Sequence, residues 1–149
     1  MFHPRIILHP TDFSERAEYA LHIAADLARQ NQATLVVLHV AETLGAENVT
    51  YGEATSKLEP EAYRQRLEQH LRQTVPAPRG VNVQYLLAAG EPAHEISRLA
   101  REHACDVIVM GTHGVGGLSR LLMGSIAEHV IRLAPCPVLV CKLPARRTD

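Results

Sequence analysis

Three glycines and a serine stand at fixed spacing in the C-terminal third of the chain. Two residues separate Gly111 from Gly114, and nine more lead to the pair Gly124 and Ser125. Glycine lets a ligand approach the backbone because it has no Cβ. The serine adds a hydroxyl at the same place. Together these residues favour an anion, and phosphate is the most natural one.

The sequence around these glycines predicts a strand, a loop, a helix and a second strand. Residues 107–110 are continuously apolar, which is typical of a strand buried on both faces. A helix is expected from about Gly124, because apolar residues then recur at helical spacing: Ile126, Ala127, Val130, Ile131 and Ala134. Two prolines end it, and the apolar strand Val138–Cys141 follows. The helix start has unpaired N–H groups and roughly half a positive charge, which suits a phosphate.

This glycine pattern matches neither of the two common phosphate-binding motifs. A P-loop needs a lysine between its last glycine and the hydroxyl residue, whereas Ser125 follows Gly124 directly. The dinucleotide pattern G-x-G-x-x-G also fails, because Ser119 stands where the third glycine is needed. An alternative is that the glycines only turn the chain and that Ser125 only caps the helix.

The rest of the chain alternates between predicted strands and helices. Apolar runs predict strands over residues 5–9 and 33–40. Residues 81–87 alternate with polar residues at first, which predicts an edge strand with one wetter face. Helical spacing predicts helices over residues 17–28, 60–75 and 92–100. With the C-terminal elements this makes an α/β chain of five strands and four helices. Such alternation predicts a parallel sheet with helices on both faces and right-handed crossovers.

Asp12 follows the first predicted strand directly. Ligands of open parallel sheets bind outside the carboxyl ends of the strands, so Asp12 is a candidate ligand contact. The spacing from Asp12 to Glu15 also fits a capping box, and the alternative is that Asp12 caps the next helix. The two roles can coexist.

The pattern G-x-x-G-x9-G-S resembles the ATP-binding signature of the universal stress protein family. The flanking segments Val-Met-Gly-Thr-His-Gly and Ala-Pro-Cys-Pro-Val-Leu-Val agree with that family, and residues 10–14 resemble its first loop. The resemblance covers nearly the whole chain and is weakest over residues 41–80. It implies one Rossmann-like domain over residues 1–149, with an open five-stranded sheet of order 3-2-1-4-5. In that order Asp12 and the glycine loop face the same crevice.

The resemblance implies a site for ATP, with Mg²⁺ carried by the nucleotide. The nucleoside is assigned to Asp12, with Thr11 beside it, and to the backbone of Val40. The phosphates are assigned to the glycine pattern and the following N–H group, namely Gly111, Gly114, Gly124, Ser125 and Ile126. His113 is expected to contact phosphate or solvent. A Cβ at Gly124 would block the close approach, so Gly124→Val is expected to weaken ATP binding and leave the fold intact.

The glycine loop favours nucleotide binding over hydrolysis, because it is poor in the cations that phosphoryl transfer needs. Val115 stands where many family members carry a basic residue, and Arg120 remains in the segment. We therefore expect an ATP-dependent sensor or regulator in the stress response, with at most weak ATPase activity and no assigned catalytic residue. The alternatives are a slow ATPase or phosphotransfer enzyme, and a dimeric interaction module that does not use nucleotide.

Histidines and cysteines offer competing chemistry. His9, His39 and His113 fall near the carboxyl ends of strands and could form a zinc site with Asp12, although each can equally have a local role. No metal site is expected. A Ser–His–Asp hydrolase is disfavoured because the chain has no G-x-S-x-G elbow. The three cysteines form no Cys-x-x-Cys pair and are expected to be reduced thiols.

Composition limits the partners. The formal net charge of −1 gives no basic surface for nucleic acid or anionic membranes, and no apolar run has membrane-spanning length. The N-terminus leads straight into the first predicted strand, so no signal peptide is expected and the protein should be cytoplasmic. Residues 41–57 lack periodicity and are expected to form a flexible loop, either a lid or a connector. The last strand, Val138–Cys141, is a candidate edge that the family commonly pairs across a two-fold axis, which predicts a homodimer.

Overall fold

The computed structural model describes residues 1–41, 60–112 and 123–144. Its strands are β1 (Ile6–Pro10), β2 (Thr34–Ala41), β3 (Asn82–Ala89), β4 (Val107–Gly111) and β5 (Val138–Cys141). Its helices are α1 (Glu15–Asn31), α2 (Pro60–Thr74), α3 (Pro92–Glu102) and α4 (Ser125–Leu133). Every strand and helix predicted from periodicity is present. The segment expected to be a loop or lid lies almost entirely outside the described residues.

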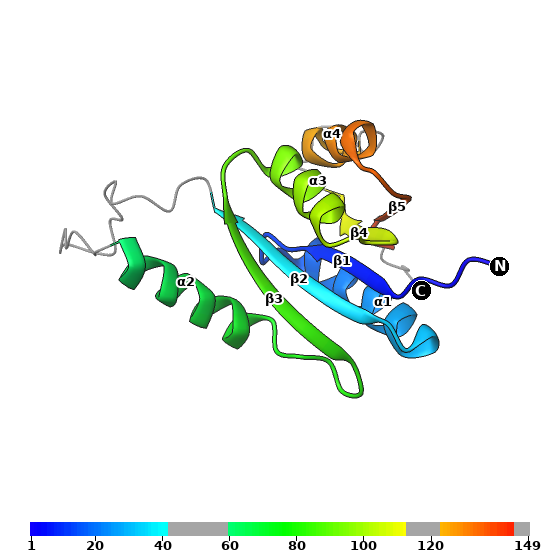
Figure 1. The fold of residues 1–149 in the computed structure, drawn as a ribbon, viewed down its shortest axis with the longest axis horizontal. Helices are drawn as coiled ribbons and strands as arrows, with labels where there is room; N and C mark the ends of the chain where they lie inside the picture. The colour runs from blue at the N-terminus through cyan, green and yellow to red at the C-terminus, as the bar shows by residue number, and fades with distance from the viewer. Residues whose placement is uncertain (42–59, 113–122, 145–149) are drawn as a thin grey trace, which may run out of the picture.

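The strands form one parallel sheet in the order β3-β2-β1-β4-β5, which confirms the expected fold (Figure 1). β1 pairs with β2 over five positions, but with β4 at only Ile7 and Leu8. Asp106 reinforces this short seam, because its carboxylate accepts the N–H groups of Arg5 at 2.8 Å and Ile6 at 2.9 Å. The strand order reverses direction between β1 and β4, and a crevice for a ligand is expected at that point.

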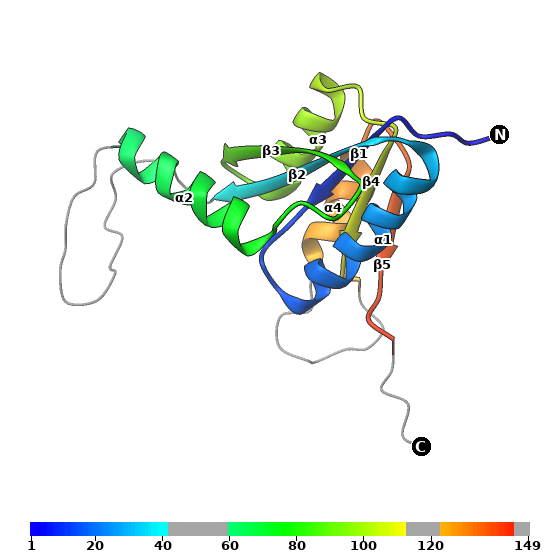
Figure 2. The same cartoon turned by 90° about the horizontal axis from the view of Figure 1, so that it is seen from below.

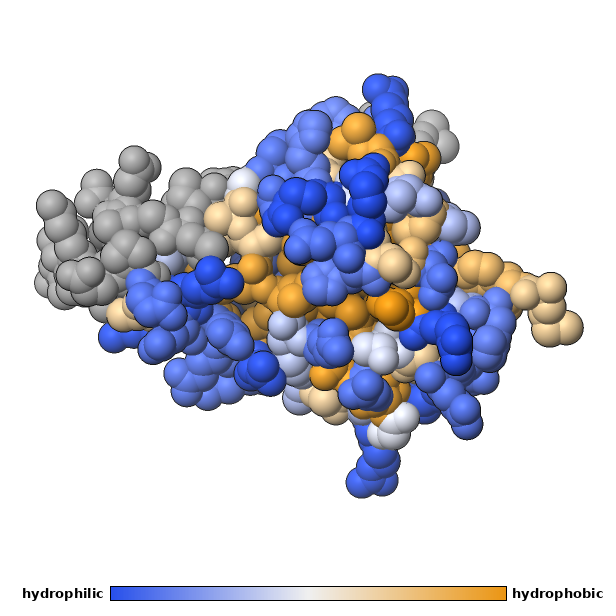
Figure 3. Space-filling view, viewed as in Figure 1, coloured by the Kyte–Doolittle hydropathy of each residue, from blue (hydrophilic) through white to orange (hydrophobic). Residues whose placement is uncertain are grey.

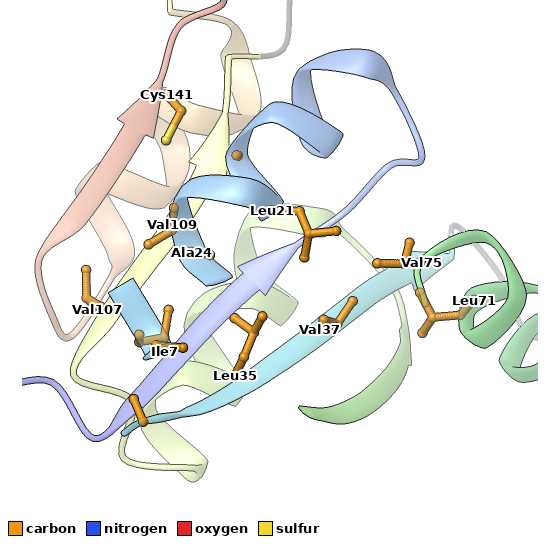
Figure 4. Close-up of a cluster of buried hydrophobic side chains, with 13 residues drawn as sticks. Ile7, Leu21, Ala24, Leu35, Val37, Leu71, Val75, Val107, Val109 and Cys141 are labelled. Atoms are coloured by element: carbon orange, nitrogen blue, oxygen red, sulfur yellow. The ribbon is translucent and has the colours of Figure 1, made fainter. Parts of the chain in front are cut away.

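Helices cover both faces of the sheet, with α1 and α2 on one face and α3 and α4 on the other (Figures 1 and 2). Successive strand residues point to opposite faces, so each strand contributes side chains to two hydrophobic cores, one on each face of the sheet. Ile7, Leu35 and Val109 belong to the core beneath α1, which Figure 4 shows, whereas Leu8 and Ile108 belong to the core beneath α3 and α4. The three central strands are therefore almost wholly apolar.

The surface follows from the same layering. β3 is an edge strand of alternating exposure, as its sequence predicted. Figure 3 shows apolar side chains gathered across the middle of this face, where β3 runs in Figure 1, with hydrophilic residues over the helices on either side. Within the described residues, no helix combines the length and the apolar character needed to cross a bilayer.

Candidate functional site

A cavity of about 100 Å³ opens at the carboxyl ends of β1, β2 and β4. It is closed on one side by the first turns of α3 and α4 and on the other by the start of α1. The predicted site residues that line it are Thr11, Asp12, Val40, Gly111 and Ile126. These residues come from segments far apart in the sequence, and the reversal of strand order brings them together.

The remaining predicted residues are placed differently. Gly124 is the N-cap of α4 and Ser125 is its first residue, directly before the cavity-lining Ile126. Neither Gly124 nor Ser125 lines the cavity itself. His113 and Gly114 lie outside the described residues. Of the described residues of the glycine pattern, Gly111 thus lines the cavity, and Gly124 and Ser125 form the helix N-terminus directly before Ile126 in the chain.

The backbone of Gly124 has φ 86° and ψ 148°, a conformation that is essentially restricted to glycine. Any side chain there strains the backbone, and the β-branched valine strains it most. The start of α4 thus favours glycine here whatever the glycine does for a ligand, and Gly124→Val is expected to cost stability through backbone strain as well as ATP affinity. That the variant keeps its fold stays a prediction.

The loop between β1 and α1 is held by short-range hydrogen bonds. The Thr11 N–H donates to the carbonyl of Leu38 on β2 at 2.8 Å, and the buried Thr11 hydroxyl accepts the Phe13 N–H at 3.1 Å. Ser14 is the N-cap of α1, since its hydroxyl accepts the Ala17 N–H at 3.2 Å. The alternative that Asp12 caps α1 is wrong: its carboxylate instead accepts the Ser14 N–H at 3.0 Å, two residues ahead. Asp12 is exposed beside the cavity, where a ligand can reach it.

Gly111 has a packing role that the sequence did not reveal. A Cβ built on it would lie 2.8 Å from the carbonyl oxygen of Arg16 and 2.9 Å from the carbonyl carbon. Backbone atoms of α1 therefore pass directly over the end of β4. The absence of a side chain at Gly111 allows this close approach, in addition to any access that it gives to a ligand.

The cavity wall includes apolar residues that sequence reasoning missed. Pro92 and Ile96 come from the first turns of α3, and Met110 from the end of β4. The available signal was that α3 follows β3 directly, so its start had to lie at the same sheet edge. These residues leave a mostly apolar slot with Asp12 and the backbone of Val40 at its border. Among the described lining residues there is no lysine or arginine.

A model of the universal stress protein family matches residues 3–142 of this sequence. The chain belongs to the universal stress protein family. It is 37% identical over 144 residues to universal stress protein MJ0531 of Methanocaldococcus jannaschii, covering 94% of this chain and 83% of that relative.

Solved structures agree with the family assignment. The structure of MJ0577 from the same archaeon matches with a TM-score of 0.67 at 32% identity, covering 97% of this chain and 99% of that one. The universal stress protein of Archaeoglobus fulgidus, solved in complex with dAMP, matches with a TM-score of 0.58 at 26% identity, covering 94% and 98%.

Two of the three histidines of the zinc alternative, His9 and His39, have separate local partners in this universal stress protein. His9 is fully buried, and its Nδ1 donates to the carbonyl of Val109 at 2.9 Å, while His39 Nδ1 pairs with the carbonyl of Thr11 at 2.9 Å. Burial lowers the pKa of His9 to about 4, so its imidazole is neutral at pH 7. The described part of the chain holds no group of three or more side chains suited to a metal ion; His113, the third histidine of the zinc alternative, lies outside it.

The cysteines are free thiols, as expected. Burial raises the pKa of Cys105 to about 12, with smaller contributions from Cys136 and Asp106. Burial also raises the pKa of Cys136 and Cys141 above the ordinary value of a thiol. The reactive form of cysteine is the thiolate, so all three thiols are poor nucleophiles at neutral pH.

Proposed function

We propose that this universal stress protein binds ATP, with Mg²⁺ carried by the nucleotide, and acts as a nucleotide-dependent sensor or regulator in the stress response. The observation that carries the proposal is the meeting of Thr11, Asp12, Val40, Gly111 and Ile126 around one cavity at the point where strand order reverses. The dAMP complex of the A. fulgidus relative supports a nucleotide as the ligand.

Each part of the nucleotide has a matching part of the site. The apolar slot between Ile96, Met110 and Val40 suits a flat base, since aromatic rings gain most from apolar walls. The Asp12 carboxylate can accept hydrogen bonds from ribose hydroxyls. The phosphates are assigned to the start of α4, where Ser125 offers a hydroxyl and Ile126 an N–H group beside the positive end of the helix.

The described lining favours binding over turnover. A phosphoryl-transfer site needs cations to neutralise the developing charge and a base that positions the nucleophile. The described lining offers neither lysine nor arginine, and its one carboxylate, Asp12, is assigned to the nucleoside. We therefore propose a protein that responds to the level of bound nucleotide and turns it over slowly at most.

The experiment is a calorimetric titration of nucleotide-stripped protein with Mg²⁺–ATP and, in parallel, with AMP. We expect a micromolar dissociation constant for ATP, which corresponds to about −8 kcal/mol, and clearly weaker binding of AMP. Ser125→Ala should weaken ATP about fivefold, through the loss of one hydrogen bond, and leave AMP unchanged. Asp12→Asn, which tests the ribose contact, should weaken both ligands.

Two results would overturn the proposal. An absence of heat and of any thermal shift with either nucleotide would leave the glycine pattern as a turn and make the chain an interaction module. Turnover of ATP far above the buffer background would make it an enzyme.

We further propose that residues 1–149 form a single domain that works in the cytoplasm as a homodimer paired through β5. Leu139, in the middle of that apolar strand, leaves 44% of its surface exposed. Ile131 and Leu133 of α4 are exposed as well, at 44% and 37%. A second copy that added its own β5 would cover the unpaired edge of the strand.

A further inference from the structure

A second and larger cavity lies on the face of the sheet that α1 and α2 cover. Its volume is about 400 Å³, and it forms a groove between α1 and residues 74–78, which connect α2 to β3. Figure 4 shows Leu21 of α1 and Val75 of the connection, which belong to the two sides of this groove. The groove and the first cavity share Thr11, Ser14 and Ala17, so the start of α1 lies between them.

The groove has an apolar floor and a polar rim. Leu21 and Val75, from its two sides, are buried, and the half-buried ring of Phe13 also lines the groove. The rim carries one acid, Glu18, and two basic side chains, the imidazole of His22 and the guanidinium of Arg29, which is already paired with Asp26 at 2.7 Å. The charges of the rim therefore favour neither an anion nor a cation, and a neutral ligand suits the groove best.

His9 contributes to the wall of this groove and supplies a hydrogen-bond acceptor. Its Nδ1 lies 2.9 Å from the carbonyl oxygen of Val109, and a carbonyl can only accept, so Nδ1 carries the proton of the neutral ring. Its Nε2 is then a bare lone pair. Among the described residues no donor reaches Nε2, which exposes less than 1 Å².

An unpaired buried acceptor costs free energy that a suitable donor recovers. The protein itself covers Nε2. A ligand donor therefore reaches this nitrogen only when the groove wall adjusts slightly. A ligand that brings a donor to an otherwise apolar groove gains both apolar burial and this hydrogen bond. The volume of the groove lies within the range that small-molecule sites occupy, roughly 300–1,000 Å³.

We propose that the groove between α1 and residues 74–78 binds a neutral small molecule with an apolar ring and one hydroxyl or N–H donor, which His9 Nε2 accepts. This site adjoins the proposed nucleotide site, with which it shares Thr11, Ser14 and Ala17, and it uses none of the glycine pattern. A ligand bound here contacts the start of α1, which also lines the first cavity.

Phenol and benzene form a matched pair of probes, because they share the ring and differ in the donor. We would titrate the full chain with each probe and follow the backbone amides and the histidine ring nitrogens by NMR. Saturable shifts are expected at Leu21, Val75 and Ala77. Phenol should bind about fivefold to tenfold more tightly than benzene, which is the effect of one hydrogen bond. Phenol alone should shift the His9 Nε2 resonance towards that of a hydrogen-bonded nitrogen.

A pair of tryptophan variants locates the site. Ala77 and Gln73 are both exposed, but only Ala77 lines the groove. Ala77→Trp should fill the groove and weaken phenol at least tenfold, whereas Gln73→Trp should bind it as the wild type does. Equal affinities for phenol and benzene, no saturable shifts up to the solubility of the probes, or unchanged binding by Ala77→Trp would each overturn the proposal. None of these measurements involves nucleotide, so a failure here leaves the ATP proposal standing.

Discussion

Gly111 illustrates how a single residue of a proposed binding site can be fixed by packing. Its Cβ would meet backbone atoms of Arg16 at 2.8 and 2.9 Å, closer than real Cβ atoms approach. We predict that Gly111→Ala lowers the free energy of unfolding by about 1–3 kcal/mol through overpacking, measured by urea denaturation. Gly80→Ala is the comparison, because Gly80 has φ 75° and open space around it, so only backbone strain of about 1–2 kcal/mol is expected. Wild-type stability in Gly111→Ala would show that α1 can move aside.

His9 makes stability depend on pH. The unfolded chain protonates this histidine below about pH 6.5, whereas the folded protein does so only near pH 4, because burial disfavours the charged ring. Between these values the unfolded state binds more protons, so stability falls as the pH drops through this window. We expect wild type to lose about 3 kcal/mol more than His9→Gln between pH 7 and pH 4, measured by urea denaturation. Gln keeps a donor for the Val109 carbonyl but cannot be protonated, so the two proteins differ mainly in the titrating ring. Identical dependence of stability on pH in wild type and His9→Gln would contradict the lowered pKa of His9.

At the scale of elements, the start of α1 depends on its cap. The Ser14 hydroxyl accepts the Ala17 N–H and so stabilises the first turn of α1, which borders both cavities. Ser14→Ala should lower the free energy of unfolding by about 1 kcal/mol, whereas Ser14→Asp, which keeps an acceptor, should stay close to wild type. Thermal or chemical denaturation of wild type and the two variants measures these differences in stability. Equal losses in both variants would mean that the hydroxyl contributes through something other than capping.

The elements were predictable because their periodicity is unambiguous, and the details that were missed depend on tertiary contacts. The apolar runs of β1, β2 and β4 and the helical spacing of α1 located these elements to within a few residues. The cap of α1 was placed two residues early, because Asp12 and Ser14 both have capping side chains. The wall contributed by α3 was missed because Pro92 is a typical helix-start residue and Ile96 a typical core residue, and neither carries a local signal of function. The packing role of Gly111 was likewise invisible, since it depends on where α1 crosses β4.

At the scale of the whole molecule, the exposed edge of β5 is the natural place for a second copy. We predict that Leu139→Asp produces a monomer in analytical ultracentrifugation, because a charge cannot be buried unpaired against the partner strand. Gln84→Asp places the same charge at an exposed position on β3, the other edge of the sheet, and should remain dimeric. A wild-type protein that sediments as a monomer, or a dimeric Leu139→Asp, would rule out pairing through β5.

The short seam between β1 and β4 has a consequence for the order in which the molecule assembles. β1, β2 and β3 pair through consecutive crossovers, as do β4 and β5, but the seam joins residues 100 and 101 positions apart. Contacts between such distant parts of the chain are slow to form, because a long loop must close first. The cavity proposed for the nucleotide has walls from both sides of the seam, so it exists only after the seam has closed. A bound nucleotide should therefore slow unfolding and leave the folding rate unchanged.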